Sequence, residues 1–261
     1  MRGTAAILCA LVLVVLPAAC GTSSSRSQAD QDKDGRVLAA AIRAVDAKGV
    51  AFTMDESLGL TGGAVPSGQA LNIHAMSSNG VLKDGNARLT YHVASGRSGV
   101  DYDMILTDAQ LFVQRRGTSG WRWTPLSATT SFFPALRLNL VRETVLLASS
   151  VSASSLTHIS SGFAHKYAVK PAPDQLEQLE AIVVEGRSET TFLKNATAEL
   201  DLFLSIPGDN LVRVEAHLTG TDPAAGTKQR VDNWVDFRSA QVGRVNPPDT
   251  ATVVAPEAIF N

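Results

Sequence analysis

Apolar and polar residues alternate along most of the chain between residues 50 and 237. Alternation with a period of two is typical of strands that bury one face. The alternating stretches are separated by turn-forming residues, among them Asn79-Gly80, Lys83-Asp84-Gly85-Asn86 and Gly208-Asp209-Asn210. The pattern therefore predicts antiparallel strands joined by hairpins. The expected strands cover residues 52–60, 71–75, 89–93, 102–106, 110–115, 121–123, 163–169, 200–206, 212–218 and 231–237.

Three stretches have helical spacing instead. Residues Gly35 to Ala47 place their apolar side chains on one helical face, and Lys48-Gly49 is expected to end that helix. A second helix is predicted from Pro134 to Ser150, with an apolar stripe made of Leu136, Leu140, Val141 and Leu147. A third, short helix is predicted to begin at Asp174 and to carry Leu176, Leu179 and Val183.

The order of these elements is one helix, about six strands, a helix, a strand, a short helix and three strands. Such an order predicts an α+β fold, in which helices cover one face of a large, curved antiparallel sheet. In the strand around Leu202 and Leu204, leucines alternate with Glu199 and Asp201. One face of the sheet is therefore expected to be apolar and the other charged.

The N-terminus has the features of an export signal. Arg2 precedes an apolar run from Ala5 to Leu16, which is shorter than the roughly 20 residues that a permanent membrane span requires. The following Leu16-Pro17-Ala18-Ala19-Cys20 resembles the lipobox of bacterial lipoproteins, although Pro17 stands where that motif usually has Leu. The resemblance implies cleavage before Cys20 and attachment of a diacylglyceryl group to its thiol. The alternative is an ordinary secretory signal in which Cys20 has no role.

These features divide the chain into three parts. Residues 1–19 are the predicted lipoprotein signal peptide. Residues 20–34 form the lipidated Cys20 and a small, polar stretch whose composition is typical of a flexible tether. Residues 35–261 have a length that suits a single domain. We therefore expect the protein at the extracytoplasmic face of the cell membrane, held by its lipid anchor.

Charge and cysteine content exclude several classes of function. The signal peptide carries only Arg2, so the mature chain has 22 basic against 25 acidic side chains and a net charge of −3. Nucleic-acid binding requires a basic excess, so we expect no nucleic-acid partner. Cys9 lies in the apolar run and Cys20 is the predicted lipidation site. The mature domain therefore has no thiol for a disulfide, a metal site or a nucleophile.

We found no motif that indicates catalysis, a metal or a cofactor. The five histidines stand singly and form no metal-binding pair: His74, His92, His158, His165 and His217. Asp101 and Asp103 share a strand face, for which solvation is a simpler explanation than acid–base chemistry. Trp121-Arg122-Trp123 suggests either a platform for a sugar headgroup or a packed strand face, and Arg115-Arg116 either an anion contact or a solvated turn. The protein is expected not to be an enzyme.

Several segments resemble the LppX/LprAFG family of actinobacterial lipoproteins. They are Leu200 to Phe203, Asn210 to Arg213, Asp232 to Phe237 and Asn246-Pro247-Pro248. The likeness extends over roughly residues 36 to 256 and departs at Thr221 to Thr227, which lengthens a late turn. It implies the fold of the lipoprotein carrier LolA and its partner LolB. In that fold a half-open β-barrel of about ten or eleven strands is capped by helices on its concave face.

The resemblance also implies a function, which is to hold acyl chains of lipids or glycolipids in an apolar cavity and to carry them through the cell envelope. Each buried CH₂ group contributes about 0.8 kcal/mol, so an apolar cavity alone can hold the acyl chains of a lipid tightly. For any single residue, ordinary core packing is the alternative. The residues expected to line the cavity are Phe52, Met54, Ile73, Leu89, Tyr91, Met104, Leu106, Leu136, Leu140, Leu202, Leu204, Val212 and Val214.

A different class of function remains open at this point. A tethered interaction module could dock on an envelope enzyme, a transporter or a sensor kinase without carrying a lipid. The expected partners of the carrier are the membrane, a lipid or glycolipid ligand and, as a further candidate, an envelope transporter. We expect a monomer without cofactors. A hollow apolar cavity would favour the carrier, whereas a filled core with an exposed apolar patch would favour the interaction module.

Overall fold

The computed structural model describes residues 28–62, 71–95, 98–126, 133–177, 192–255 and 258–259. The predicted signal peptide and Cys20 lie outside these residues. In chain order the elements are α1 (Gln28–Lys48), β1 (Val50–Thr61), β2 (Leu71–Lys83), β3 (Asn86–Ser95), β4 (Ser98–Leu106), β5 (Gln110–Arg115), β6 (Trp121–Pro125), α2 (Leu138–Leu146), β7 (Ser150–Ile159), β8 (Gly162–Lys170), α3 (Pro173–Leu176), β9 (Lys194–Ser205), β10 (Leu211–Asp222), β11 (Thr227–Ser239) and β12 (Ala251–Val253).

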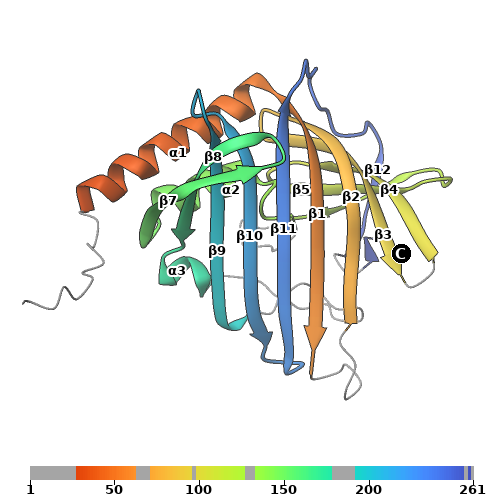
Figure 1. The fold of residues 1–261 in the computed structure, drawn as a ribbon. Helices are drawn as coiled ribbons and strands as arrows, with labels where there is room; N and C mark the ends of the chain where they lie inside the picture. The colour runs from red at the N-terminus through yellow and green to blue at the C-terminus, as the bar shows by residue number, and fades with distance from the viewer. Residues whose placement is uncertain are drawn as a thin grey trace, which may run out of the picture.

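The strands form one twelve-stranded sheet in the described part of the chain, in the order β12-β6-β5-β4-β3-β2-β1-β11-β10-β9-β8-β7. Neighbours are antiparallel, except that β12 runs parallel to β6. Strands β9, β10, β11, β1 and β2 stand side by side in Figure 1, and the sheet remains open because β7 and β12 do not pair. This confirms the predicted α+β fold with a large curved antiparallel sheet.

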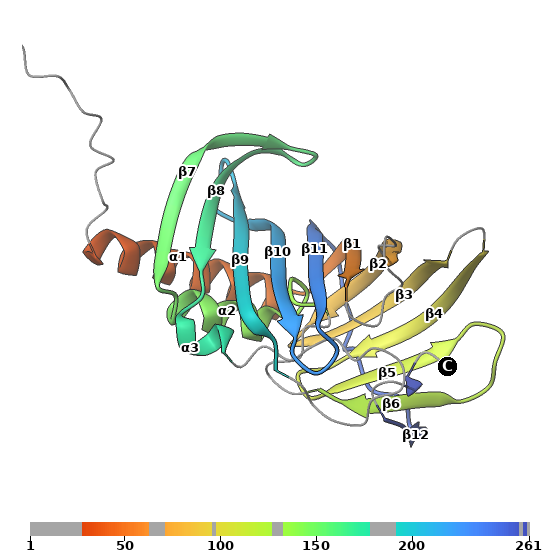
Figure 2. The same cartoon turned by 90° about the horizontal axis from the view of Figure 1, so that it is seen from below.

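The sheet bends towards the side on which α1 and α2 lie, as the course of β4, β5 and β6 shows in Figure 2. We call this side the concave face and the opposite side the outer face. Helix α1 crosses one end of the strands and contacts α2, β7, β2 and β10. Its buried Leu38, Ile42 and Val45 have the predicted helical spacing and belong to the core.

Helix α1 begins at Gln28, seven residues before the predicted start at Gly35. Residues 28–34 therefore belong to the helix and not to the predicted tether. Asp30, Asp32 and Asp34 lie near the helix N-terminus, where their negative charges stabilise the helix by interacting with its dipole. The helix ends as predicted at Gly49, whose φ is +76° and whose N–H donates to the Val45 carbonyl over 3.1 Å.

The second predicted helix was too long at both ends. Pro134 to Leu136 form a turn, and α2 begins only at Leu138, so its buried stripe consists of Leu138, Val141, Thr144 and Val145. Ser150 begins strand β7, which the sequence pattern did not predict because its serines interrupt the alternation of apolar residues. Helix α3 covers only Pro173–Leu176, and the predicted helical positions Leu179 and Val183 lie outside the described residues.

Asn79-Gly80 does not form the predicted turn, because β2 continues through it to Lys83. A Cβ atom at Gly80 would lie 2.4 Å from Phe52 Cζ and 2.6 Å from the Arg88 carbonyl oxygen. The glycine is therefore required by the close approach of the Phe52 ring. The actual hairpin turn is the second predicted one, where Asp84 and Gly85 have φ values of 52° and 76°.

The segment Thr221 to Thr227, predicted to lengthen a turn, extends two strands instead. Strand β10 runs to Asp222 and β11 starts at Thr227, which leaves four residues for the turn. Asp222 is buried, and its Oδ1 accepts hydrogen bonds from the N–H groups of Ala224 and Ala225 over 2.9 and 3.2 Å. The carboxylate thereby fixes the turn.

The C-terminal tail adds the unpredicted strand β12 to the sheet edge. Its residues pair in parallel with Trp121, Arg122 and Trp123 of β6. On the outer face, the two tryptophans pack with a cluster that includes Val245 from the same tail. The packed strand face, rather than a platform for sugars, is therefore the environment of Trp121 and Trp123.

Candidate lipid-binding face

The concave face consists of side chains that form rows across neighbouring strands. One row joins Leu202, Val214, Val235 and Met54 on β9, β10, β11 and β1. These residues are almost completely buried and belong to a large cluster that also contains the buried side chains of α1 and α2. We call it the helix-covered cluster. Cross-strand contacts of this kind are the main source of side-chain stabilisation in a sheet.

Ten of the thirteen predicted lining residues lie together in the helix-covered cluster, and their contact with a ligand stays a prediction. Their burial under the helices also means that, in this structure, they pack as core. They are Phe52, Met54, Leu89, Tyr91, Met104, Leu106, Leu136, Leu202, Leu204 and Val214.

Three predicted residues do not join this cluster. Leu140 is only half-buried, because α2 starts at Leu138 and turns a different side to the core. Val212 packs on the outer face with Phe203, since a register shift between Leu211 and Arg213 reverses its side; Leu211 enters the core instead. Ile73 lies on β2 opposite Leu58, but its side chain is outside the described residues.

A second apolar row crosses the concave face farther from α1. It consists of Ala198, Leu218, Val231 and Leu58, which are paired in that order on β9, β10, β11 and β1. These four residues form a separate cluster, which we call the far cluster, and no helical residue of the described part of the chain belongs to it. Leu58 and Ala198 are half-buried, whereas Leu218 and Val231 are buried. The apolar concave face therefore continues beyond the part that α1 and α2 cover.

Polar side chains separate the two clusters on β11 and β1, whereas on β9 and β10 the same row consists of the apolar Leu200 and Ala216. Asn233 and Glu56 are paired in the intervening row, on β11 and β1. The buried Asn233 accepts a hydrogen bond from the Ala135 N–H over 2.9 Å. Glu56 Oε1 accepts one from the Tyr91 hydroxyl over 3.4 Å, and the Tyr91 ring meets Phe133 edge-on at 5.2 Å. These contacts fasten the turn around Phe133 to the sheet.

Desolvation dominates the electrostatics of Glu56. Burial raises the pKa of its carboxyl group to about 8, against the smaller lowering effects of hydrogen bonds from Tyr91 and the Phe133 backbone. The pKa of the Tyr91 hydroxyl is raised by its burial and by the neighbouring Glu56. Glu56 is therefore neutral at pH 7 and can donate as well as accept a hydrogen bond.

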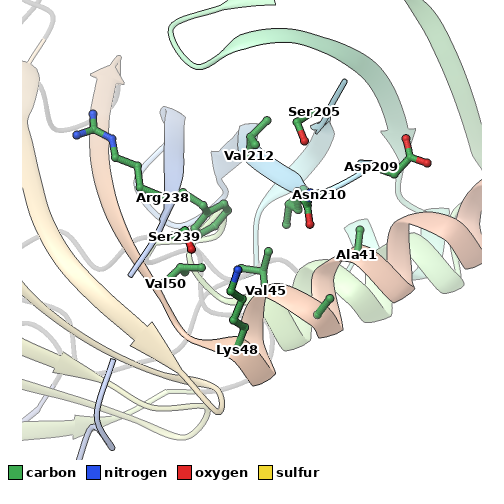
Figure 3. A pocket seen from close by; sticks show the side chains of 13 residues that line it. Ala41, Val45, Lys48, Val50, Ser205, Asp209, Asn210, Val212, Arg238 and Ser239 are labelled. Carbon is green, nitrogen blue, oxygen red and sulfur yellow. The ribbon is translucent and has the colours of Figure 1, made fainter. Parts of the chain in front are cut away.

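A small pocket lies at the edge of the helix-covered cluster, between α1 and the adjoining ends of β9, β10 and β11 (Figure 3). It has a volume of about 290 Å³. Apolar Ala41 and Val45 form part of its wall, while Lys48, Asp209 and Arg238 add charged groups. This volume is at the lower limit for small-molecule pockets, and the mixed lining does not suit an acyl chain.

The outer face is charged, as predicted, and many of its charged side chains form ion pairs. Asp101 lies 2.6 Å from His92 Nδ1, and Asp103 accepts hydrogen bonds from Arg116. The two aspartates therefore have different partners and do not face each other as an acid–base pair. Arg213 forms a two-pronged contact with Asp236, at 2.6 and 2.8 Å.

Sequence reasoning missed several residues of the concave face. Glu56 has the spacing of Met54 and Leu58 and so occupies an inward position, a signal that the alternation did contain. Asn233 likewise shares the phase of Val231 and Val235. The indication available in the sequence was a polar residue at a position where the alternation calls for an apolar one. Leu211 could not be found in this way, because its orientation depends on the bulge.

The fold and site define an α+β protein with an open, curved antiparallel sheet and an apolar concave face. Solved structures similar to it include LppX from Mycobacterium tuberculosis, at 12% identity and a TM-score of 0.43, covering 84% of this chain and 99% of that chain. LprF from Mycobacterium bovis gives 12% identity, a TM-score of 0.38 and coverage of 83% and 96%. Both are lipoproteins of the family that the sequence resembles.

A putative outer membrane lipoprotein-sorting protein domain from Vibrio parahaemolyticus is also similar, at 8% identity and a TM-score of 0.32, covering 80% of this chain and 94% of that chain. At such identities and TM-scores the likeness does not extend to ligands or residue roles. No family model and no curated protein sequence matches the chain. None of the helices in the described residues has the length and apolar character of a membrane span.

Proposed function

We propose that this chain is a membrane-anchored, extracytoplasmic lipoprotein that binds acyl chains of a lipid or glycolipid on its concave face and carries them within the cell envelope. The observation that carries the proposal is the far cluster. It extends the apolar concave face across β9, β10, β11 and β1, beyond the region that described helical residues cover. An acyl chain that covers such a surface gains about 0.8 kcal/mol per buried CH₂.

The anchor rests on the sequence. Cys20 follows an apolar run and small residues in the arrangement of a lipobox, and a lipid on its thiol would hold the domain at the outer surface of the cell membrane. One acyl chain gives only weak and reversible membrane binding, whereas a diacylglyceryl group supplies two. The proposed ligand is a separate lipid, bound by the domain.

Native mass spectrometry tests lipid carriage directly. Residues 21–261 are exported in an actinobacterial host and purified without detergent. We expect a mass above that of the polypeptide by one lipid, and organic extraction should release the same lipid. A polypeptide mass alone, together with failure to bind added phospholipid or glycolipid, would contradict the proposal.

A docking module is the second candidate, and a different observation favours it. Leu156 and Phe163 of the β7–β8 hairpin are 54% and 57% exposed, and the nearby Ile206 is 40% exposed. The Ile206 N–H donates to the Phe163 carbonyl over 2.9 Å, so these residues are neighbours. Exposed apolar patches often mark protein interfaces. This candidate would lead if the chain proved unable to bind lipid.

A further inference from the structure

Three potential metal ligands meet on the outer face of β9 and β10. Glu215 lies directly opposite Asp201 in the pairing of the two strands, and His217 follows Glu215 on the same face of β10. One ligand atom from each residue lies within 4.8 Å of the other two. Like charges directly opposite each other destabilise a sheet unless a positive charge compensates them. Lys166 and Arg213 each pair with one of these carboxylates, and the arrangement also favours a further cation.

The buried carboxylate of Asp201 provides an independent indication. Only 4% of the residue is exposed. Its Oδ2 forms an ion pair with Lys166 Nζ at 2.6 Å, whereas its Oδ1 is buried without a hydrogen-bond donor. Leaving a buried acceptor unsatisfied costs about 1–3 kcal/mol, and more for a charged group. Such an atom in a native protein calls for a water molecule or an ion as its partner.

His217 is oriented as metal-bound histidines usually are. Its Nδ1 lies 2.7 Å from Asp232 Oδ1. Donation of the Nδ1 hydrogen to this carboxylate leaves the lone pair on Nε2, which is then the nitrogen able to bind a cation. A carboxylate behind the imidazole fixes the ring and increases its basicity, which is the usual outer shell of a zinc-bound histidine.

The surrounding charges leave room for a divalent cation. Arg213 Nη1 donates to Glu215 Oε1 over 3.2 Å, which leaves the second oxygen of Glu215 for another partner. The ion pairs around the three residues contain four carboxylates and three cationic side chains, a net charge of −1 when the imidazole is neutral, and the exposed Glu199 opposite His217 adds a further negative charge. The groups in these ion pairs are Asp201, Glu215, Asp232, Asp236, Lys166, Arg213 and Arg230.

We infer that Asp201, Glu215 and His217 form a binding site for a divalent transition-metal cation of the zinc type. One imidazole nitrogen and two carboxylate oxygens are a ligand set that Zn²⁺ accepts, with water in the remaining position. No metal was expected from the sequence because its histidines stand singly, whereas here two ligands are neighbours on one strand face and the third comes from the adjacent strand. The inference does not depend on lipid binding.

Calorimetric titration with Zn²⁺ tests the site. The full chain is purified in a non-ionic detergent, any thiol that remains free is alkylated so that none binds the metal, and residual metal is removed with a chelator. We expect one Zn²⁺ per chain. His217→Asn and Glu215→Gln should each weaken binding at least tenfold, because loss of even an outer-shell partner typically costs 10–100-fold.

His92→Asn is the matched control. His92 also stands on the outer face, with its Nδ1 2.6 Å from Asp101, but no group of three potential ligands in the described residues includes it. Its replacement should leave Zn²⁺ affinity unchanged. X-ray absorption at the zinc edge gives a second measurement on the unmutated chain, with one imidazole and otherwise oxygen ligands expected.

Each outcome decides the matter. Absence of Zn²⁺ binding, or an absorption spectrum without an imidazole ligand, would overturn the site. Equal loss of affinity in the His92 and His217 variants would indicate unspecific surface binding and would overturn it as well. Circular dichroism of the metal-free variants shows whether they are folded. If His217→Asn is not, Asp232→Asn replaces it, with an expected 10–100-fold loss of affinity.

Discussion

Glu56 places a carboxyl group inside an apolar layer, between the helix-covered cluster and the far cluster. Its neighbours supply one hydrogen bond from Tyr91 and a contact to the Phe133 backbone, which is too little to keep the group ionised. A neutral acid in this position holds the turn around Phe133 on the sheet. The consequence is a dependence of stability on pH that originates from one residue.

The sign of this dependence follows from the pKa of Glu56, which is about 8 in the folded protein against a reference value of 4.5. Between these values the folded state keeps a proton that the unfolded state has lost, so the free energy of unfolding falls as pH rises from 4.5 to 8. Glu56→Gln should remove this fall, so near pH 8 the variant should be more stable than the unmodified protein. A shift of one pKa unit corresponds to about 1.4 kcal/mol, so the difference should be a few kcal/mol at most.

Urea denaturation of both proteins at several pH values measures this effect. The difference between them isolates Glu56, because burial also raises the pKa values of Asp46 and Asp55. Glu143→Gln, at an exposed position of α2, should leave the pH dependence as it is. Parallel curves for the Glu56→Gln variant and the unmodified protein would show that Glu56 is ionised in the folded state.

Gly80 gives a second prediction for a single residue. In Gly80→Ala the new methyl group would collide with the Phe52 ring and with the backbone oxygen of Arg88, and backbone cannot move aside as a side chain can. We expect a loss of about 1–3 kcal/mol in the free energy of unfolding, which is typical of overpacking. Gly243→Ala is the control, since no atom lies within 4 Å of its Cβ position. Equal stability of both variants would contradict the argument.

Among the elements, strands with regular alternation could be predicted and irregular ones could not. Strand β11 alternates without interruption and was found, whereas β7 is rich in serine and has a register shift between Ala153 and Leu156. The pairing of β12 with β6 depends on the position of the tail in space, which no local pattern contains. The faces of the residues follow the same rule: Leu202 and Val214 lie on the predicted concave face, whereas Val212, at a bulge, lies on the outer face.

The two apolar surfaces, the far cluster and the β7–β8 hairpin, predict different effects on lipid binding. Leu58→Asn puts an amide on the concave face. It should lower the affinity for lipid about tenfold, and with it the fraction of chains that carry lipid, because contact with CH₂ groups is lost and a polar group is buried. Leu156→Asn, at a 54% exposed position of the hairpin, should leave that fraction unchanged. Native mass spectrometry of the two variants compares them. The opposite result would assign lipid binding to the hairpin.

On the scale of the whole molecule, the fold class could be predicted because it depends on the order and periodicity of many elements. An open sheet with helices on one face follows from alternating strands and amphipathic helices, and a few misplaced boundaries do not change it. What the sequence could not supply is how far α1 and α2 extend over the concave face. That depends on side-chain packing at the ends of β1, β2 and β10, and it determines which part of the apolar face is filled as core.

The early start of α1 limits how far the domain could move from the proposed lipid anchor on Cys20. Gln28 follows Cys20 by eight residues, and a fully extended chain of that length spans no more than about 29 Å, at 3.6 Å per residue. With the proposed lipid on Cys20, a connection this short would keep the domain beside the bilayer. Since α1 lies against β7, the proposed anchor would keep that edge of the sheet nearest the membrane. A cargo destined for a more distant layer would have to be passed on to another molecule there.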